Sequence, residues 1–211
     1  MKVTLIATVF LLIASFTFAQ VPQLSPFSSD LQITTSRANV PQDITGQVFV
    51  GSGHIRINLN SGPRKTSVIT DFATTTTDIL LPDQQMYIEH KAGGTPGRGP
   101  DTMTTDLKPY DPDHPCANQP DITCKKVGSE EVSGRMCDHW QITDKNGKVS
   151  DVWIDRKLHF PVKLTSPDST LLLTNIKEGQ PDAGTFDIPA DYRKLDLSSI
   201  TMPNSTAQPH N

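Results

Sequence analysis

Residues 124–160 constrain the fold of this 211-residue chain more than any other stretch. They contain both tryptophans, two of the three cysteines and three segments in which apolar and polar residues alternate. A period of two is typical of β-strands that bury one face. Between two of these segments, the pair Asn146-Gly147 is a strong signal for a tight hairpin turn. The stretch therefore predicts consecutive antiparallel strands that form the spine of a β-domain.

Short strands with turn signals between them recur along the rest of the chain. In one of them, Ile55, Ile57 and Leu59 alternate with polar residues, which predicts one buried and one wet face. Strands are expected at residues 31–36, 47–50, 54–59, 65–72, 79–81, 86–90, 125–132, 135–143, 149–155, 160–165 and 170–177. Long amphipathic helices are missing from the sequence pattern. We therefore expect a mainly β, mostly antiparallel fold with little helix.

The first nineteen residues have the features of a secretory signal peptide. Lys2 supplies a short positive region, residues 5–16 are largely apolar, and Ala19 offers a small residue before the predicted cleavage point. A membrane-spanning helix needs ~20 apolar residues, and this run is shorter. The pattern favours a cleaved signal over a membrane anchor, and no later segment is apolar enough to cross a bilayer. We expect cleavage after Ala19 and a periplasmic or secreted protein.

The charge of the chain argues against nucleic acid as a partner. There are 19 Lys and Arg against 23 Asp and Glu. Loss of the signal would change the formal net charge from −4 to −5, because Lys2 is the one charged residue removed. Phosphate contacts require clustered Lys and Arg side chains, and the sequence shows no such cluster.

Three cysteines, Cys116, Cys124 and Cys137, leave one thiol over if a disulfide forms. An exported protein meets an oxidising compartment, so we expect one disulfide. Pairing Cys116 with Cys124 closes a short proline-containing loop and is the preferred prediction. The alternative pairs Cys124 with Cys137. In the preferred pairing Cys137 is a small buried apolar residue within a strand.

The sequence predicts a single domain over residues 20–195, with a long irregular loop at 91–121 and a disordered tail at 196–211. Asp111, Asp113, His114 and Cys116 in that loop do not match the spacing of a zinc site. The sequence has no G-x-S-x-G, H-E-x-x-H or paired C-x-x-C motif. We therefore predict no catalytic residues, no metal site and no cofactor.

Several segments, in this order, resemble a family of bacterial exported domains of uncharacterised function. They are DFATTTTDILLPDQQMYIEH, GSEEVSGRMCDHWQI, VWIDRKLHFPVKL and LLLTNIKEGQPDAGTFDIPADYRK. That family is similar to the outer-membrane lipoprotein carrier and receptor proteins (LolA/LolB-like), and the resemblance covers about residues 30–194. It implies a strongly curved antiparallel sheet that forms an incomplete, half-open β-barrel with an apolar concave face.

The resemblance leads to two hypotheses for function. The first is a non-enzymatic binding protein of the cell envelope, whose concave face takes a lipid, an acyl chain or a lipid-modified protein. The residues predicted to line that face are Ile55, Ile57, Val68, Leu80, Met86, Ile88, Trp140, Ile154 and Leu172. The alternative is an envelope interaction or scaffold module that grips another protein with its sheet edges and the 91–121 loop.

Overall fold

The structure is a computed structural model. It describes residues 24–36, 41–51, 53–91, 114–117, 121–182 and 184–196. The predicted signal peptide, most of the predicted loop at 91–121 and nearly all of the predicted tail lie outside these ranges.

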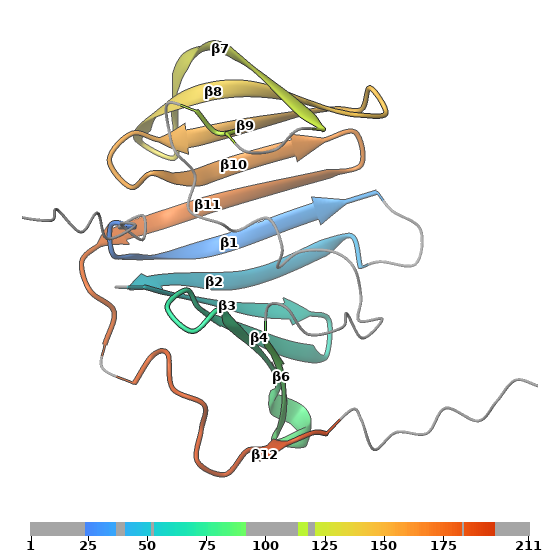
Figure 1. The fold of residues 1–211 in the computed structure, drawn as a ribbon, viewed down its shortest axis with the longest axis vertical. Coiled ribbons are helices and arrows are strands. Elements are labelled where there is room, and N and C mark those ends of the chain that lie inside the picture. The colour runs from blue at the N-terminus through green and yellow to red at the C-terminus, as the bar shows by residue number, and fades with distance from the viewer. Residues whose placement is uncertain are drawn as a thin grey trace, which may run out of the picture.

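The described residues form one twelve-stranded sheet (Figure 1). The strands are β1 (Phe27–Thr35), β2 (Asp43–Gly51), β3 (His54–Ser61), β4 (Arg64–Asp71), β5 (Thr76–Leu81), β6 (Met86–Lys91), β7 (Ile122–Val132), β8 (Arg135–Asp144), β9 (Val149–Asp155), β10 (Phe160–Ser166), β11 (Ser169–Glu178) and β12 (Arg193–Lys194). One turn of 3-10 helix, Pro82–Gln84, joins β5 to β6. The predicted mainly β fold is confirmed.

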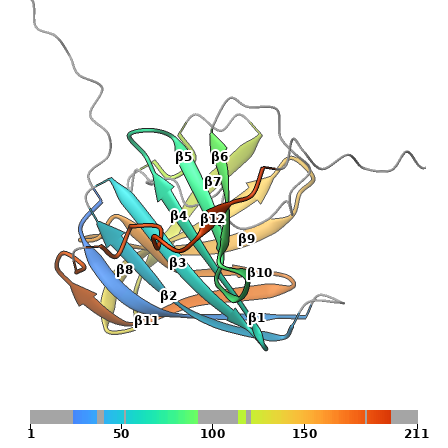
Figure 2. The same ribbon diagram turned by 90° about the horizontal axis from the view of Figure 1, so that it is seen from below.

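The order of strands across the sheet is β12-β6-β5-β4-β3-β2-β1-β11-β10-β9-β8-β7. Neighbouring strands are antiparallel except β12, which runs parallel to β6. The first strand pairs with β2 on one side and with β11 on the other, so it joins the two halves of the sheet. The edge strands β12 and β7 do not pair with each other, so the sheet stays open. Figure 2 shows its curvature, and the predicted incomplete barrel is confirmed.

The hairpin between β8 and β9 forms at the predicted turn. Gly147 has a φ of 78°, a left-handed conformation that glycine adopts without steric cost. One carboxylate oxygen of Asp144 accepts hydrogen bonds from the backbone N–H groups of Asn146 and Lys148 at 2.8 and 2.9 Å. The turn residues therefore fix the register of the predicted hairpin.

The main hydrophobic cluster lies on one face of β1, β2 and β3 and continues to residues of β8–β11. Its buried members are Leu24, Phe27, Leu31, Ile33, Ile44, Val48, Val50, Ile55, Ile57, Cys137, Trp153, Leu158, Phe160, Val162 and Leu173. Phe27 and Phe160 meet edge to face, with ring centroids 5.2 Å apart. The contact brings the start of β1 against the start of β10.

A second cluster contains Trp140, Val152 and Ile154. Trp140 pairs with Val152, Val152 pairs with Leu164, and Leu164 pairs with Leu171. Leu171 pairs with Ile33 of β1, and directly paired residues of antiparallel strands project to the same face. The second cluster therefore lies beside the main cluster on one face of the sheet. Trp140 and Ile154 share this face with Ile55.

A bulge interrupts the pairing of β10 with β9. The register shifts between Pro161 and Lys163, so Val162 is an extra residue. Beyond the bulge, Leu164 pairs with Val152 on one side and with Leu171 on the other. The bulge therefore leaves the face of Trp140 and Val152 continuous with that of β11 and β1.

The C-terminal segment, residues 184–196, covers one face of β3–β6 (Figure 2). Arg56 of β3 donates a hydrogen bond to the carbonyl of Thr185 at 2.9 Å, and His54 stacks on Phe186 with ring centroids 5.4 Å apart. At the sheet edge, Lys194 binds Glu89 at 2.8 Å. We call this side of β3–β6 the covered face.

Candidate functional site

The opposite side of β3–β6 carries two rows of mostly apolar side chains. In the first row, Ile57 of β3 pairs with Val68 of β4, Val68 with Ile79 of β5, and Ile79 with Ile88 of β6. Directly paired residues of antiparallel strands project to the same face. These four residues therefore form a continuous stripe across four strands.

The second row lies beside the first and contains Leu59, Thr66, Leu81 and Met86. Leu59 pairs with Thr66 and Leu81 with Met86, while the two-residue offset from the first row places all four on the same side. We call the two rows together the apolar face.

Burial of the apolar face decreases towards the edge of the sheet. Ile57 and Val68 are 9% and 7% exposed, whereas Ile79 and Ile88 are only half-buried. Leu59 packs against the main cluster, so the face continues from the core. The outer half of the face thus keeps apolar surface that the described residues do not fully bury.

The structure brings together seven of the nine predicted lining residues on this side of the sheet. Ile55 and Ile57 belong to the main cluster, and the cross-strand register adds Val68, Met86 and Ile88. Trp140 and Ile154 lie on the same side in the second cluster.

Two predicted lining residues are wrong because the alternation of their strands has the other phase. Leu80 pairs with Ser67 of β4 and is fully buried on the covered face. Leu172 pairs with the exposed Gln32, whereas its neighbour Leu173 belongs to the main cluster. Leu80 and Leu172 therefore lie on the opposite side of the sheet.

Sequence reasoning missed Leu59, Ile79 and Leu81 as lining residues. The alternation marks Leu59 only as an inward residue of its strand. The run Ile79-Leu80-Leu81 is apolar on both sides and has no visible alternation. The signal that resolves it is the partner strand, because Met86 and Ile88 alternate clearly and pair with Leu81 and Ile79.

A stacked cluster of aromatic and charged groups lies on β8–β10. The His139 ring stacks on Trp153 with centroids 4.3 Å apart, and the Lys163 ammonium lies 4.2 Å from the Trp153 ring centroid. His139 Nε2 is 2.8 Å from Asp151 Oδ1, and the Trp153 indole donates a hydrogen bond to Glu130. Within the described part of the chain, no hydroxyl or thiol hydrogen-bonds to His139, so the cluster lacks an activated nucleophile.

Two buried carboxylates on β8 and β9 hold ion networks. Asp138, 5% exposed, accepts hydrogen bonds from Arg156, Ser129 and Lys126. Burial opposes ionisation of Asp138, but these three donors outweigh it and hold its pKa below the usual value. Asp155, 2% exposed, is bound by Arg135. The hydrogen bonds of Asp138 and Asp155 go to other residues of the chain, which is typical of structural ion pairs.

The predicted disulfide between Cys116 and Cys124 is present, with Cα atoms 5.9 Å apart. Cys124 packs against the second cluster, so the disulfide ties its loop to β7 and β8. Cys137 is a free, fully buried thiol, as predicted. Burial raises the pKa of Cys137 to about 11, which leaves it protonated and unreactive at neutral pH.

Among the described residues, no group of three or more His, Cys, Asp or Glu side chains could hold a metal ion. The same residues contain no helix long and apolar enough to span a membrane.

An open, curved β-sheet with one apolar face defines the structural class of this protein. The chain belongs to the family described as a domain of unknown function (DUF4412), whose model matches residues 27–160. The predicted membership of an uncharacterised family is confirmed. No protein among the curated sequences compared with it matches this chain.

The fold is similar to those of three solved structures. An uncharacterized conserved protein from Thermus thermophilus has a TM-score of 0.54 and 8% identity, over 81% of this chain and 90% of that chain. MucB has a TM-score of 0.52 and 15% identity, over 81% of this chain and 60% of that chain. The MucA/MucB complex of Pseudomonas aeruginosa has a TM-score of 0.52 and 14% identity, over 87% of this chain and 63% of that chain.

The chain thus spans about 60% of the length of MucB. At these identities the likeness concerns the fold alone. MucB has the LolA/LolB-like fold, so the predicted resemblance of fold is confirmed.

Proposed function

We propose that this protein is an exported, non-enzymatic binding protein of the bacterial cell envelope. Its ligand is an acyl chain, carried by a lipid or by a lipid-modified protein, and its binding site is the apolar face. The observation that supports this proposal is the half-buried state of Ile79, Leu81, Met86 and Ile88 on β5 and β6. Ligand sites are concave and mostly apolar, and this face combines sheet curvature with an apolar lining.

The size of the face suits a single chain rather than a bulky ligand. Strands lie ~4.8 Å apart, so four strands give a stripe roughly 14 Å wide. Burial of ten methylene groups would contribute about 8 kcal/mol before the costs of association. Because those costs offset part of this gain, we expect affinity nearer to micromolar than to nanomolar.

Export is supported by the disulfide. Cys116 and Cys124 form a disulfide, and disulfides persist in oxidising compartments such as the periplasm or the cell exterior. Its presence agrees with the signal peptide predicted over residues 1–19.

The test uses the full chain without residues 1–19 and a fluorescent fatty acid, 11-(dansylamino)undecanoic acid. We expect saturable binding that Ile88→Asn weakens by roughly tenfold or more, since loss of one apolar contact costs ~1.5 kcal/mol. The matched control is Val127→Asn on β7, because Val127 is 54% exposed and lies off the apolar face. Native mass spectrometry of the purified protein reports any lipid retained from the cell.

Absence of saturable binding and of retained lipid would count against the proposal. Equal loss of affinity in Ile88→Asn and Val127→Asn would count against the apolar face as the site. Circular dichroism of each variant shows whether it remains folded.

A protein–protein interaction role is the second candidate, favoured by the exposed edge of the sheet. The edge strand β7 is eleven residues long and largely exposed, and unpaired edges are templates for a partner strand. The fold likeness to MucB, seen in a complex with MucA, agrees with such a role. Envelope proteins that co-purify with the wild type but not with Val127→Asp would support it, and an unchanged partner set would oppose it.

A further inference from the structure

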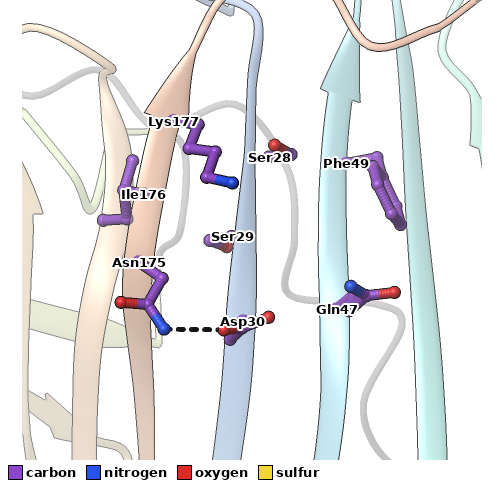
Figure 3. A pocket seen from close by; sticks show the side chains of 8 residues that line it. All are labelled: Ser28, Ser29, Asp30, Gln47, Phe49, Asn175, Ile176 and Lys177. Carbon is purple, nitrogen blue, oxygen red and sulfur yellow. Dashed lines mark hydrogen bonds between the residues drawn. The ribbon is translucent and has the colours of Figure 1, made fainter.

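A pocket of about 500 Å³ lies over β11, β1 and β2 (Figure 3). Its lining residues are Ser28, Ser29, Asp30, Gln47, Phe49, Asn175, Ile176 and Lys177. Gln47 and Phe49 alternate with the buried core residues Val48 and Val50, so they project away from the main cluster. The pocket is therefore separate from the apolar face.

A bulge in β11 opens this pocket. Ser28 pairs with Lys177 and Asp30 pairs with Thr174, so β11 carries one extra residue at this point. Asn175 within the bulge has a φ of 51°, a left-handed conformation that asparagine tolerates better than most residues. From there its side-chain amide donates a hydrogen bond to Asp30 Oδ2 at 2.8 Å.

Cross-strand pairing arranges the lining in two short rows. Lys177, Ser28 and Phe49 lie side by side on three strands. In the next row Asp30 pairs with Gln47, and Asn175 reaches Asp30 from the bulge. An ammonium group, a carboxylate, two amides, a hydroxyl and an aromatic ring thus surround one space (Figure 3).

Several polar groups of this pocket have no partner within the described part of the chain. The side chains of Ser28, Gln47 and Lys177 make no hydrogen bond or ion pair to described residues. Their polar atoms are therefore available to a ligand. Ser29 differs, because it pairs with the core residue Val48 and its buried side chain projects towards the main cluster. Figure 3 draws Ser28 and Ser29 on opposite sides of β1.

We propose that this pocket binds a sugar ring. Sugar hydroxyls both donate and accept hydrogen bonds, and the amides of Gln47 and Asn175 can do the same, as can the hydroxyl of Ser28. The half-buried ring of Phe49 supplies an apolar wall for the C–H face of a sugar. One carboxylate and one ammonium balance in charge, so the site has no net attraction for a phosphate or for a cation.

The volume agrees with this ligand class. Pockets for small molecules usually enclose about 300–1,000 Å³ and place a few polar groups around an apolar surface. The mixed lining also distinguishes this pocket from the apolar face, whose described residues carry a single hydroxyl, on Thr66. The proposal is independent of the acyl-chain function, because it rests on other residues and another side of the sheet.

The first experiment is a titration of the ¹⁵N-labelled chain without residues 1–19, followed by NMR. The probes are glucose, galactose and N-acetylglucosamine at millimolar concentrations, with leucine as a zwitterionic comparison. We expect saturable shifts of the backbone amides of residues 28–30, 47–49 and 175–177 with at least one sugar. No saturable shift with any sugar, or a response to leucine alone, would overturn the proposal.

The second experiment uses variants and keeps the same readout. Asp30→Asn and Gln47→Ala should each weaken the best sugar by roughly tenfold, because each removes hydrogen bonds to the ligand. Asp43→Asn is the matched control, since Asp43 is an exposed carboxylate at the far end of β2. Unchanged affinity in both pocket variants would overturn the assignment of the site, even if the sugar binds elsewhere.

Discussion

Replacement of Arg135 by methionine should strongly destabilise the protein, because it leaves a buried carboxylate without its cation. Arg135 Nε donates to Asp155 Oδ2 at 2.5 Å, and its Nη2 also binds Glu178 at 2.9 Å. The side chain of Asp155 is only 3% exposed. Removal of one partner of a buried pair costs about 3–5 kcal/mol, since the remaining charge stays desolvated.

We expect the lower end of that range for Arg135→Met. Asp155 keeps two other donors, the backbone N–H groups of Lys157 and Leu158, both 2.7 Å from its Oδ1. A loss of about 3 kcal/mol in the free energy of unfolding corresponds to a fall of roughly 6–12 °C in Tm for a domain of this size. Urea unfolding followed by circular dichroism and by tryptophan fluorescence measures the change.

Two further variants test the physical reason. Lys157→Met removes an exposed cation that binds Glu178, so its effect should be much smaller. The double variant Arg135→Met with Asp155→Asn should recover part of the loss, because it removes the stranded charge. A loss below about 1 kcal/mol for Arg135→Met, or a double variant no more stable than Arg135→Met alone, would refute the reasoning.

Three other predictions concern the cysteines and one carboxylate. Replacement of Cys116 and Cys124 by serine should lower the free energy of unfolding by ~2.5 kcal/mol, measured in urea, because their disulfide closes a short loop. Cys137 should resist iodoacetamide at pH 8 in the folded protein and react once urea unfolds it, as mass spectrometry would show. The pKa of Asp138 in the folded protein lies below its unfolded value of ~3.9. Ionised Asp138 therefore stabilises the fold at pH values above ~3.9, and this stabilisation is lost as the pH falls through the folded pKa. The urea midpoint of Asp138→Asn should therefore fall less between pH 5 and pH 3 than that of the wild type.

Local patterns were enough to predict the hairpins of this fold. The turn at Asn146-Gly147 and the alternation around Ile55 and Ile57 depend only on neighbouring residues, and both appear in the structure as predicted. The Cys116–Cys124 disulfide was predictable for the same reason, because it closes a short loop. The curvature of the sheet came from the family resemblance and not from any single segment.

The predicted binding face was wrong where a run of apolar residues hides the phase of a strand. Leu80 and Leu172 each stand in the middle of three consecutive apolar residues, so only the partner strand shows which face they occupy. The bulge around Asn175 likewise depends on the partner strand and leaves no clear mark in the sequence. The polar pocket around Asn175 was missed for the same reason, since its residues meet only through the bulge and the pairing of β1 with β11.

The position of β5 and β6, which carry the outer half of the apolar face, depends on packing against the covered face, because these strands have few other buried contacts. In these two strands Leu80 is buried, and it lies on the covered face. A Cβ on Gly51 would lie 2.6 Å from Phe186 Cε2, so Gly51→Ala should displace the C-terminal segment. Amide hydrogen exchange in β5 and β6 should then accelerate, because local opening becomes easier.

Gly128→Ala is the matched control, since a Cβ at Gly128 would meet nothing within 4 Å. Exchange in β5 and β6 that stays the same in Gly51→Ala as in Gly128→Ala would show that the segment does not support these strands. Faster exchange confined to the Gly51 variant would instead mean that the C-terminal segment holds Ile79 and Ile88 in place from behind. The geometry of the proposed acyl-chain site would then be set by residues that no ligand touches.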